Sequence, residues 1–163
     1  MDDRQWLREE RDRRAIEELI KRYFLSLDRG DPALQDEVFA PDGRLWVGGK
    51  VIRGPGAEPP GAVAGIDGTP EGFTHVLGQS VIWLDGDRAR GESNAVAYLV
   101  MAGEPRRMLV RGLRYLDHFV RTAAGWRIAD RRHNLDWMFE APASVAVPLA
   151  GRVQLDRFDL GPV

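Results

Sequence analysis

The sequence contains no cysteine, and this absence excludes several kinds of site at once. Disulfide frameworks, thiolate zinc sites, iron–sulfur clusters and cysteine nucleophiles all require that residue. Neither sign of charge dominates, because 23 Lys and Arg stand against 25 Asp and Glu, giving a formal charge of -2. We therefore expect no nucleic-acid partner and no binding to an anionic membrane surface.

Long apolar runs are also missing. None approaches the roughly 20 residues of a transmembrane helix, and the acidic start, Met-Asp-Asp-Arg-Gln-Trp, lacks the apolar core of a signal peptide. A chain of 163 residues has the usual length of one domain and can bury a core without disulfides. These features predict a cytoplasmic globular protein with a single domain over residues 1–163.

The start of the chain predicts a long helix. Its apolar residues recur three and four positions apart, as they do on the buried face of an amphipathic helix. They are Ile16, Leu19, Ile20, Tyr23, Phe24 and Leu27. Asp2 or Asp3 can cap the first turn, and Asp28-Arg29-Gly30 should end the helix because glycine favours the left-handed conformation found there.

A second helix and a hairpin are predicted next. Asp31-Pro32 is a typical helix opening, so we expect a short helix over Ala33–Phe39 that ends at Pro41-Asp42-Gly43. Two short apolar runs around Gly48-Gly49-Lys50 predict a hairpin. Its strands are expected over residues 44–47 and 51–53.

The second half of the chain predicts a sheet. Four long β-branched and aromatic runs are separated by short Asp-, Gly- and Pro-containing turns, a pattern typical of an antiparallel meander. These strands are expected over Phe73–Leu84, Arg88–Met101, Arg107–Arg121 and Trp126–Trp137. A Pro- and Gly-rich loop over Gly54–Gly72 precedes them, and a tail without periodicity follows from Met138. Helices first and strands later indicate an α+β fold.

Known catalytic and cofactor motifs are absent from the sequence. It has no phosphate-binding glycine–lysine loop, dinucleotide fingerprint or nucleophile elbow. The histidines, His75, His118 and His133, are dispersed and lack metal-binding spacing, so we expect no metal site. Asp28 departs from a local rule, because an acid at a helix C-terminus faces the negative end of the macrodipole. It is either a surface acid beside Arg29 or a functional residue.

Two further side chains are candidates because they should point into the protein. Strict alternation places His75 on an apolar strand face with Leu77, Val81 and Trp83. Tyr23 lies within the apolar stripe of the first helix, so its hydroxyl needs a buried partner. Each residue also has a purely structural interpretation, as a core histidine or a core tyrosine.

The last two strands carry a further group of polar side chains. Tyr115 and Asp117 share one strand face, and Arg131 and His133 share a face of the next strand. Arg131 precedes another arginine, so only one of the two can face solvent, and an arginine turned inward needs an anion. A His, an Asp, a Tyr and an Arg around one cavity could move a proton. The His would exchange it, the Asp would orient the ring, and the Tyr or Arg would stabilise negative charge.

Several motifs stand in order along the chain. They are Ala15-Ile16-x-x-Leu19-x-x-x-Tyr23-x-x-x-x-Asp28-x-Gly30-Asp31, Phe39-Ala40-Pro41-Asp42-Gly43, His75, Gly112-x-Arg114-Tyr115-x-Asp117 and Gly125-Trp126-Arg127-Ile128-x-x-Arg131. In these motifs, from about Asp12 to Trp137, the chain resembles the SnoaL-like branch of the nuclear-transport-factor-2-like superfamily. That branch includes scytalone dehydratase, hexachlorocyclohexane dehydrochlorinase and bile-acid 7α-dehydratase. The motifs are specific to the superfamily rather than to one activity.

The resemblance implies a cone-shaped α+β fold, in which a curved, antiparallel-rich sheet wrapped by N-terminal helices encloses a cavity. It also implies catalysis without a cofactor by an Asp–His dyad, here Asp28 and His75. Tyr23 matches a tyrosine of the bile-acid enzyme, and Arg131 matches an active-site arginine of the dehydrochlorinase. The expected substrate-binding residues are Trp46, Tyr115 and Asp117. Within Gly54–Gly72 the chain departs from the branch, because prolines stand where its members usually have a helix.

The function implied is that of a lyase or isomerase, dehydratase-like, which removes a proton from a hydrophobic small molecule. Two alternatives stay open: a polyketide cyclase, or a non-catalytic domain that binds a small molecule or mediates dimerisation. We also expect a homo-oligomer, either a dimer or a trimer. The long strands present more apolar surface than one layer of helices can cover. The outward apolar residues are expected to include Val96, Tyr98, Val100, Leu116 and Val120.

Overall fold

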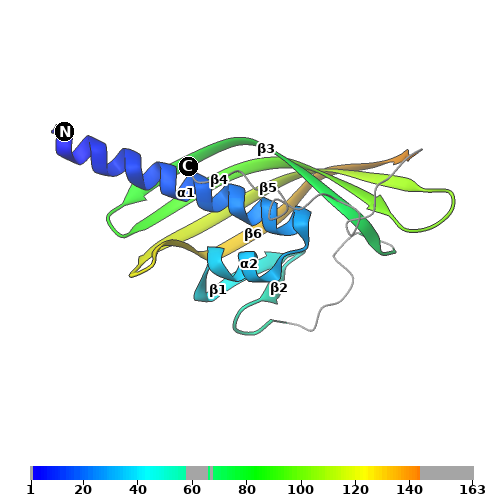
Figure 1. Ribbon diagram of the computed structural model, residues 1–163, viewed down its shortest axis with the longest axis horizontal. Helices are drawn as coiled ribbons and strands as arrows, with labels where there is room; N and C mark the ends of the chain where they lie inside the picture. Colours follow the sequence, from blue (N-terminus) through cyan, green and yellow to red (C-terminus); the bar gives the residue numbers. More distant parts are fainter. Residues whose placement is uncertain (1, 58–65, 67, 144–163) are drawn as a thin grey trace, which may run out of the picture.

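The computed structural model describes residues 2–57, 66 and 68–143. Within that part, two helices precede a six-stranded sheet with the order β2-β1-β6-β5-β4-β3 (Figure 1). The elements are α1 (Asp3–Arg29), α2 (Pro32–Val38), β1 (Phe39–Val47), β2 (Lys50–Arg53), β3 (Pro70–Asp85), β4 (Arg88–Met101), β5 (Arg107–Thr122) and β6 (Gly125–Pro142). Neighbouring strands are antiparallel except β1 and β6, which run parallel. The predicted α+β class and meander are confirmed.

Both helices start at the predicted caps. The Asp2 carboxylate accepts a hydrogen bond from the backbone N–H of Gln5 at 2.7 Å, and α1 ends at Gly30, whose φ of 62° is left-handed. The Asp31 side chain caps α2 in the same way, accepting from Leu34 N–H at 3.0 Å. These caps fix where α1 ends, and Asp28 lies in its last turn.

The predicted second helix is found and ends at Val38, one residue before the expected Phe39, but the segment expected to close it is not a turn. Pro41-Asp42-Gly43 lies inside β1, which begins at Phe39 and pairs in parallel with β6. The register of that pairing is irregular between Phe39 and Arg44, so Pro41 can occupy the strand without donating a ladder hydrogen bond. A side chain at Gly43 would place its Cβ 2.6 Å from the carbonyl oxygen of Ile128, and glycine therefore allows this close approach.

The last strand is longer than predicted, because β6 continues past Trp137 to Pro142. The extra residues pair with the start of β5, for example Phe139 with Val110, and this tertiary pairing was not visible as a local pattern. The predicted loop also ends earlier, since Pro70 already pairs with Met101 of β4. Residues 58–65 and 67 of that loop, and 144–163 of the predicted tail, lie outside the described residues.

Helix α1 lies across the inner face of the curved sheet (Figure 1). The predicted apolar stripe supplies its buried side, where Ile16 and Ile20 are almost completely inaccessible. These residues pack against the inward side chains of the strands, including Leu99, Phe119 and Ile128. Burial of one such side chain contributes about 1.5–3 kcal/mol, so this layer holds α1 against the sheet.

Strand β3 changes faces in its middle. Its pairing with β4 shifts between Leu77 and Ser80, and the side-chain oxygen of Asn94 accepts the displaced Gln79 N–H at 2.7 Å. Such a bulge reverses the alternation beyond it. His75 and Leu77 therefore face inward as expected. Val81 and Trp83 lie on the outer face, and the prediction that they share the face of His75 is wrong.

The outer face of the sheet carries exposed apolar side chains from all four long strands. The most exposed are Val76, Val81, Trp83, Tyr98, Leu116, Trp137 and Phe139. Light scattering over a concentration series should show a dimer or trimer, because apolar surface spread over several strands is costly to leave in water. A monomer at every concentration would contradict this expectation.

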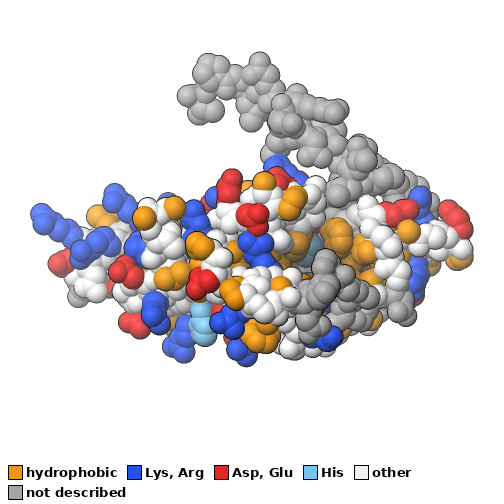
Figure 2. All heavy atoms as spheres, turned by 90° about the horizontal axis from the view of Figure 1, so that it is seen from below, with side chains coloured by type: hydrophobic (Ala, Val, Ile, Leu, Met, Phe, Trp, Pro, Cys, Tyr) orange, Lys and Arg blue, Asp and Glu red, His pale blue; other side chains and the backbone are white. Residues whose placement is uncertain are grey.

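Charged side chains of both signs are interspersed over the face shown in Figure 2. This distribution agrees with the balanced composition and shows no single-signed surface on that face. Among the helices that the structure describes, none combines the length and the apolar composition needed to cross a membrane.

Candidate active site

A cavity of about 230 Å³ lies between α1 and the inner face of the sheet. Most of its wall is apolar, and its polar side chains come from different elements: Tyr23, Gln35, Arg53, His75, Arg111, Tyr115 and His133. Room for the cavity comes partly from Ala97 on β4, which stands between His75 on β3 and Arg111 on β5 in one cross-strand row. A larger residue there would fill the space between the two polar side chains.

The structure brings Asp28 and His75 together at the cavity wall. The ring Nδ1 of His75 lies 2.6 Å from Oδ1 of Asp28, and the His75 backbone N–H donates to the same carboxylate at 3.0 and 3.1 Å. These contacts offset the unfavourable position of an acid at the end of α1. The His75 side chain is 5% exposed and that of Asp28 is 24% exposed, so the pair is largely but not completely shielded from solvent.

The contact with Asp28 decides which nitrogen of His75 is available. An ionised carboxylate can only accept hydrogen bonds, so Nδ1 carries the hydrogen that lies between the two groups. In the neutral ring the other nitrogen, Nε2, then holds the free lone pair. Aromatic neighbours fix the plane of the ring, with Phe73 stacked at 6.4 Å and Phe24 tilted at 5.3 Å between centroids. A histidine ring held in this way has the geometry that a general base requires.

Arg131 faces inward, as the sequence predicted, but it does not line the cavity in the part of the chain that is described. Its Nε and one terminal nitrogen each donate to an Asp117 oxygen at 2.7 Å, and both side chains are 0% exposed. The guanidinium lies 4.1 Å from the Tyr23 ring centroid and 4.8 Å from that of Tyr115. Arg131 and Asp117 therefore pack behind the tyrosine rings, and neither is among the described residues that line the cavity.

Trp46 is also placed away from the cavity. It alternates with the buried Leu45 and Val47, so its side chain lies on the other face of β1. There its indole N–H donates to Asp130 at 2.9 Å, and Arg132 lies over its ring at 5.5 Å. The sequence identified an aromatic residue on the correct strand, but the alternation of β1 puts it on the outer face.

Tyr23 and Tyr115 do line the cavity, as expected. Their rings pack edge to face at 6.0 Å between centroids. Burial raises the pKa of the Tyr23 hydroxyl and raises that of Tyr115 well above its usual range. Both phenols therefore keep their protons at neutral pH and can donate hydrogen bonds to an oxygen atom in the cavity.

Four polar residues of the cavity were given no role from the sequence: Gln35, Arg53, Arg111 and His133. Arg111 shares the inner face of β5 with Tyr115, four residues away, and period-two alternation could have revealed it. His133 pairs across the sheet with Tyr115, and the two rings meet at 5.3 Å between centroids. Burial lowers the pKa of His133 to about 4, with a further contribution from the charge of Arg111. His133 is therefore neutral at physiological pH.

Lowering the pH should reduce the free energy of unfolding, because it protonates His133. Its pKa falls from an ordinary 6.5 to about 4 on folding, so the unfolded chain binds the proton more tightly. The contribution of neutral His133 to the free energy of unfolding is therefore fully present above about pH 6.5 and is lost as the pH falls. At pH 4 the loss reaches about 3 kcal/mol. The free energy of unfolding, measured with urea across this pH range, should depend less on pH for His133→Gln than for the wild type. If the free energy of unfolding changed equally with pH in both proteins, His133 would not be the source of the acid sensitivity.

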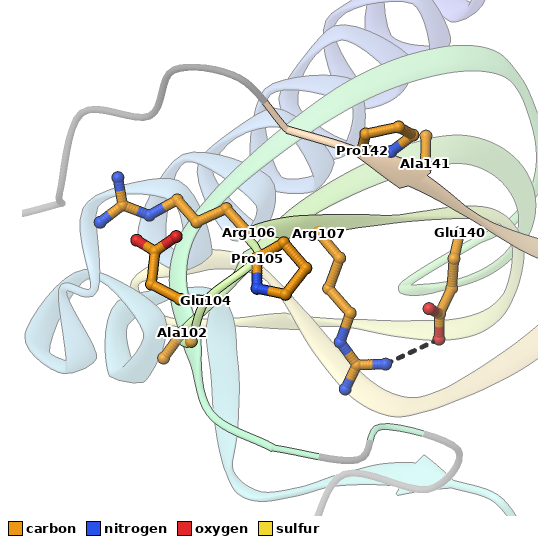
Figure 3. Close-up of a pocket in the computed structure, with 9 residues that line it drawn as sticks. Ala102, Glu104, Pro105, Arg106, Arg107, Glu140, Ala141 and Pro142 are labelled. Carbon is orange, nitrogen blue, oxygen red and sulfur yellow. Dashed lines mark hydrogen bonds and ion pairs between the residues drawn. The ribbon is translucent and has the colours of Figure 1, made fainter.

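Another hollow, of about 580 Å³, lies at the turn between β4 and β5 (Figure 3). Both of its arginines are engaged with other residues: Arg107 donates to Glu140 at 2.9 Å, and Arg106 forms an ion pair with Glu71 at 3.3 Å. No histidine or tyrosine is among its described lining residues. No three His, Asp or Glu side chains in the described ranges converge as metal ligands. The cavity beside Asp28 and His75 is thus the better candidate for acid–base chemistry.

Comparison with known proteins places this fold among relatives. The sequence profile of the SnoaL-like domain matches residues 8–132. An uncharacterized protein of Mycobacterium tuberculosis is 31% identical over 123 residues, which cover 74% of this chain and 82% of that protein. A nuclear-transport-factor-2-like protein of Novosphingobium aromaticivorans, solved as a crystal structure, is 31% identical with a TM-score of 0.63, covering 83% of this chain and 92% of that one.

A second similar structure belongs to an enzyme. The hexachlorocyclohexane dehydrochlorinase type 3 of Novosphingobium barchaimii superimposes with a TM-score of 0.72, covering 87% of this chain and 98% of that one. Its sequence identity is 16%, so this likeness concerns the fold. The profile match spans most of the chain and agrees with the element order and sheet topology. The chain belongs to the SnoaL-like domain family of the nuclear-transport-factor-2-like superfamily.

Proposed function

We propose that this protein is a lyase or isomerase that removes a proton from a compact hydrophobic molecule, using Asp28 and His75. The observation that carries the proposal is the 2.6 Å contact between the His75 ring and the Asp28 carboxylate at the wall of a largely apolar cavity. A dehydrochlorinase with the same fold supports it, because that enzyme's name describes an elimination. The proposed reaction needs only side chains of this chain.

In the proposed reaction, Nε2 of His75 takes a proton from a carbon next to a carbonyl group. The C–H electron pair moves into a new carbon–carbon double bond, and the carbonyl electrons move to its oxygen. Asp28 stabilises the imidazolium that forms and keeps the ring in place. A phenolic O–H in the cavity, that of Tyr23 or Tyr115, can donate a hydrogen bond to the enolate oxygen and stabilise it. In an elimination, the carbonyl then re-forms, the electron pair shifts into a double bond to the adjacent carbon, the bond from that carbon to the leaving group breaks, and the imidazolium protonates the departing group. In an isomerisation, the carbonyl re-forms as the imidazolium returns the proton to another carbon.

The cavity limits the size of the substrate. Sites for drug-sized ligands usually measure about 300–1,000 Å³, and this cavity is smaller, at about 230 Å³. Its apolar wall includes Leu27, Leu45, Val47, Leu99 and Leu113. A molecule of one or two fused rings with few polar atoms fits both properties.

Hydrogen–deuterium exchange tests the proposal without knowledge of the natural substrate. The probe is 2-tetralone, a bicyclic ketone whose protons next to the carbonyl exchange slowly in D₂O and are observed by NMR. The wild-type protein should accelerate this exchange over buffer. His118→Gln is the matched control, because His118 lies on the exposed face of the same sheet and its loss should change nothing.

The result also separates the proposal from its main alternative. Acceleration by the wild type and by His118→Gln supports proton abstraction in the cavity. Binding of the ketone without any acceleration of exchange would contradict the proposal and favour a non-catalytic binding domain.

A further inference from the structure

His75 lies on an edge strand, because β3 pairs only with β4 among the strands that the structure describes. In the middle of β3, Gly78 and Gln79 together face the single residue Asn94 of β4. The side-chain oxygen of Asn94 accepts a hydrogen bond from the Gln79 N–H at 2.7 Å, and a Cβ atom at Gly78 would collide with that oxygen. The bulge is thus held by a side-chain hydrogen bond for which glycine leaves the space.

The register of β3 shows what the extra residue does to His75. After the bulge, Ser80 stands opposite Ser93. If the strand continued backwards from this pair without a bulge, His75 would stand opposite Tyr98, whose side chain is exposed on the outer face. The bulge shifts the partner of His75 by one residue to Ala97, which belongs to the cavity wall. The extra residue therefore decides that His75 points into the cavity.

Both halves of β3 bury their inward side chains, and regular alternation cannot satisfy them together. Leu77 in the first half, and Ile82 and Leu84 in the second, all pack against the core. Leu77 and Ile82 are separated by an odd number of positions, so a strand without a bulge would direct them to opposite faces. The competing regular register keeps the second half buried and turns His75 away from Asp28.

We propose that Asn94 and Gly78 are positioning residues, which act through the bulge to hold His75 beside Asp28 in the cavity. This inference rests on the proposed function and extends it to two residues on the exposed outer face of the sheet. The amide oxygen of Asn94 replaces the backbone carbonyl that the displaced Gln79 N–H has lost. About one net hydrogen bond thereby favours the bulged register over the regular one.

Substitution of Asn94 tests the inference through the backbone amide of His75, which donates to Asp28. In Asn94→Ala, the protection of this amide against exchange with D₂O, measured by NMR, should fall by roughly two- to tenfold, the factor set by one net hydrogen bond. The catalysed exchange of 2-tetralone protons should slow by up to the same factor. Asn94→Asp retains the oxygen acceptor and should behave as the wild type. Asn134→Ala is the same change on the exposed part of β6 and should alter neither rate.

Deletion of Gly78 makes the test specific for the bulge. The shortened β3 places Gln79 alone opposite Asn94 and leaves His75 opposite Ala97, so the orientation of the base no longer depends on a bulge. Asn94→Ala should then change neither rate. Equal effects of Asn94→Ala with and without Gly78, or unchanged protection of the His75 amide in Asn94→Ala, would overturn the inference.

The amide measurement also separates this inference from the proposed function, because it needs no catalysis. A wild-type protein that leaves 2-tetralone exchange at the buffer rate would contradict the proposed function, while the His75 amide still decides the role of Asn94. The buried Ile128 on β6 serves as the internal control, since a general loss of stability would lower the protection of both amides equally. If a melting curve shows that the deletion variant does not fold, equal protection of His75 in Asn94→Ala and Asn94→Asp would overturn the inference.

Discussion

Replacing His75 by Gln should slow the enzyme-dependent exchange of 2-tetralone protons by about 10²–10⁴-fold, the usual effect of losing a general base. Glutamine has a similar volume and can still donate a hydrogen bond towards Asp28, but it cannot accept a proton from carbon. The melting temperature should therefore change little. Exchange rates and melting temperatures measured on the same samples check both parts of the expectation.

The opposite pattern would identify a structural pair. If the contact between Asp28 and His75 only stabilises the fold, His75→Gln should lower the free energy of unfolding by about 1–3 kcal/mol, because a buried partner loses its hydrogen bond. Exchange catalysed by the folded fraction would then stay at the wild-type rate. His118→Gln again controls for loss of an imidazole outside the cavity.

The second large effect concerns stability and comes from the ion pair behind the cavity. Asp117→Asn should lower the free energy of unfolding by about 3–5 kcal/mol, because it leaves the guanidinium of Arg131 buried without its compensating charge. The loss should also reach the cavity, since that guanidinium packs on the Tyr23 and Tyr115 rings. Urea unfolding of the two proteins measures the difference.

The outer face of the same sheet supplies the control for this experiment. Asp136 forms an ion pair with Arg114 at 3.2 Å, and both side chains are partly exposed. Asp136→Asn should cost only about 0–1 kcal/mol, as exposed ion pairs usually do. A loss of similar size for Asp117→Asn would show that the buried pair contributes no more than a surface pair.

The sequence predicted those features that depend on local chemistry. The caps at Asp2 and Asp31, the stop at Gly30 and the turns between the long strands all follow from the conformational preferences of single residues. Features set by pairing partners were harder to predict. The end of β6 at Pro142 and the inclusion of Pro41 in β1 depend on strands that are distant in sequence.

The candidate site shows the same difference between features set by local chemistry and features set by residues distant in sequence. Helix-end chemistry made Asp28 a candidate, and strand alternation showed only that one of Arg131 and Arg132 faces inward. The family resemblance was needed to pair Asp28 with His75 and to select Arg131. The identity of the partner of Arg131 could not be read from one strand, since Asp117 belongs to another. The bulge in β3 moved Val81 to the outer face, because one displaced residue reverses the alternation that the prediction had assumed.

A double-mutant cycle on proton exchange tests the dyad most directly. Rates are measured for the wild type, His75→Gln, Asp28→Asn and the double variant under identical conditions. If Asp28 acts only by orienting and stabilising His75, the double variant should exchange the ketone protons about as slowly as His75→Gln alone. Losses that multiply in the double variant would show that the two residues act independently and would contradict the dyad.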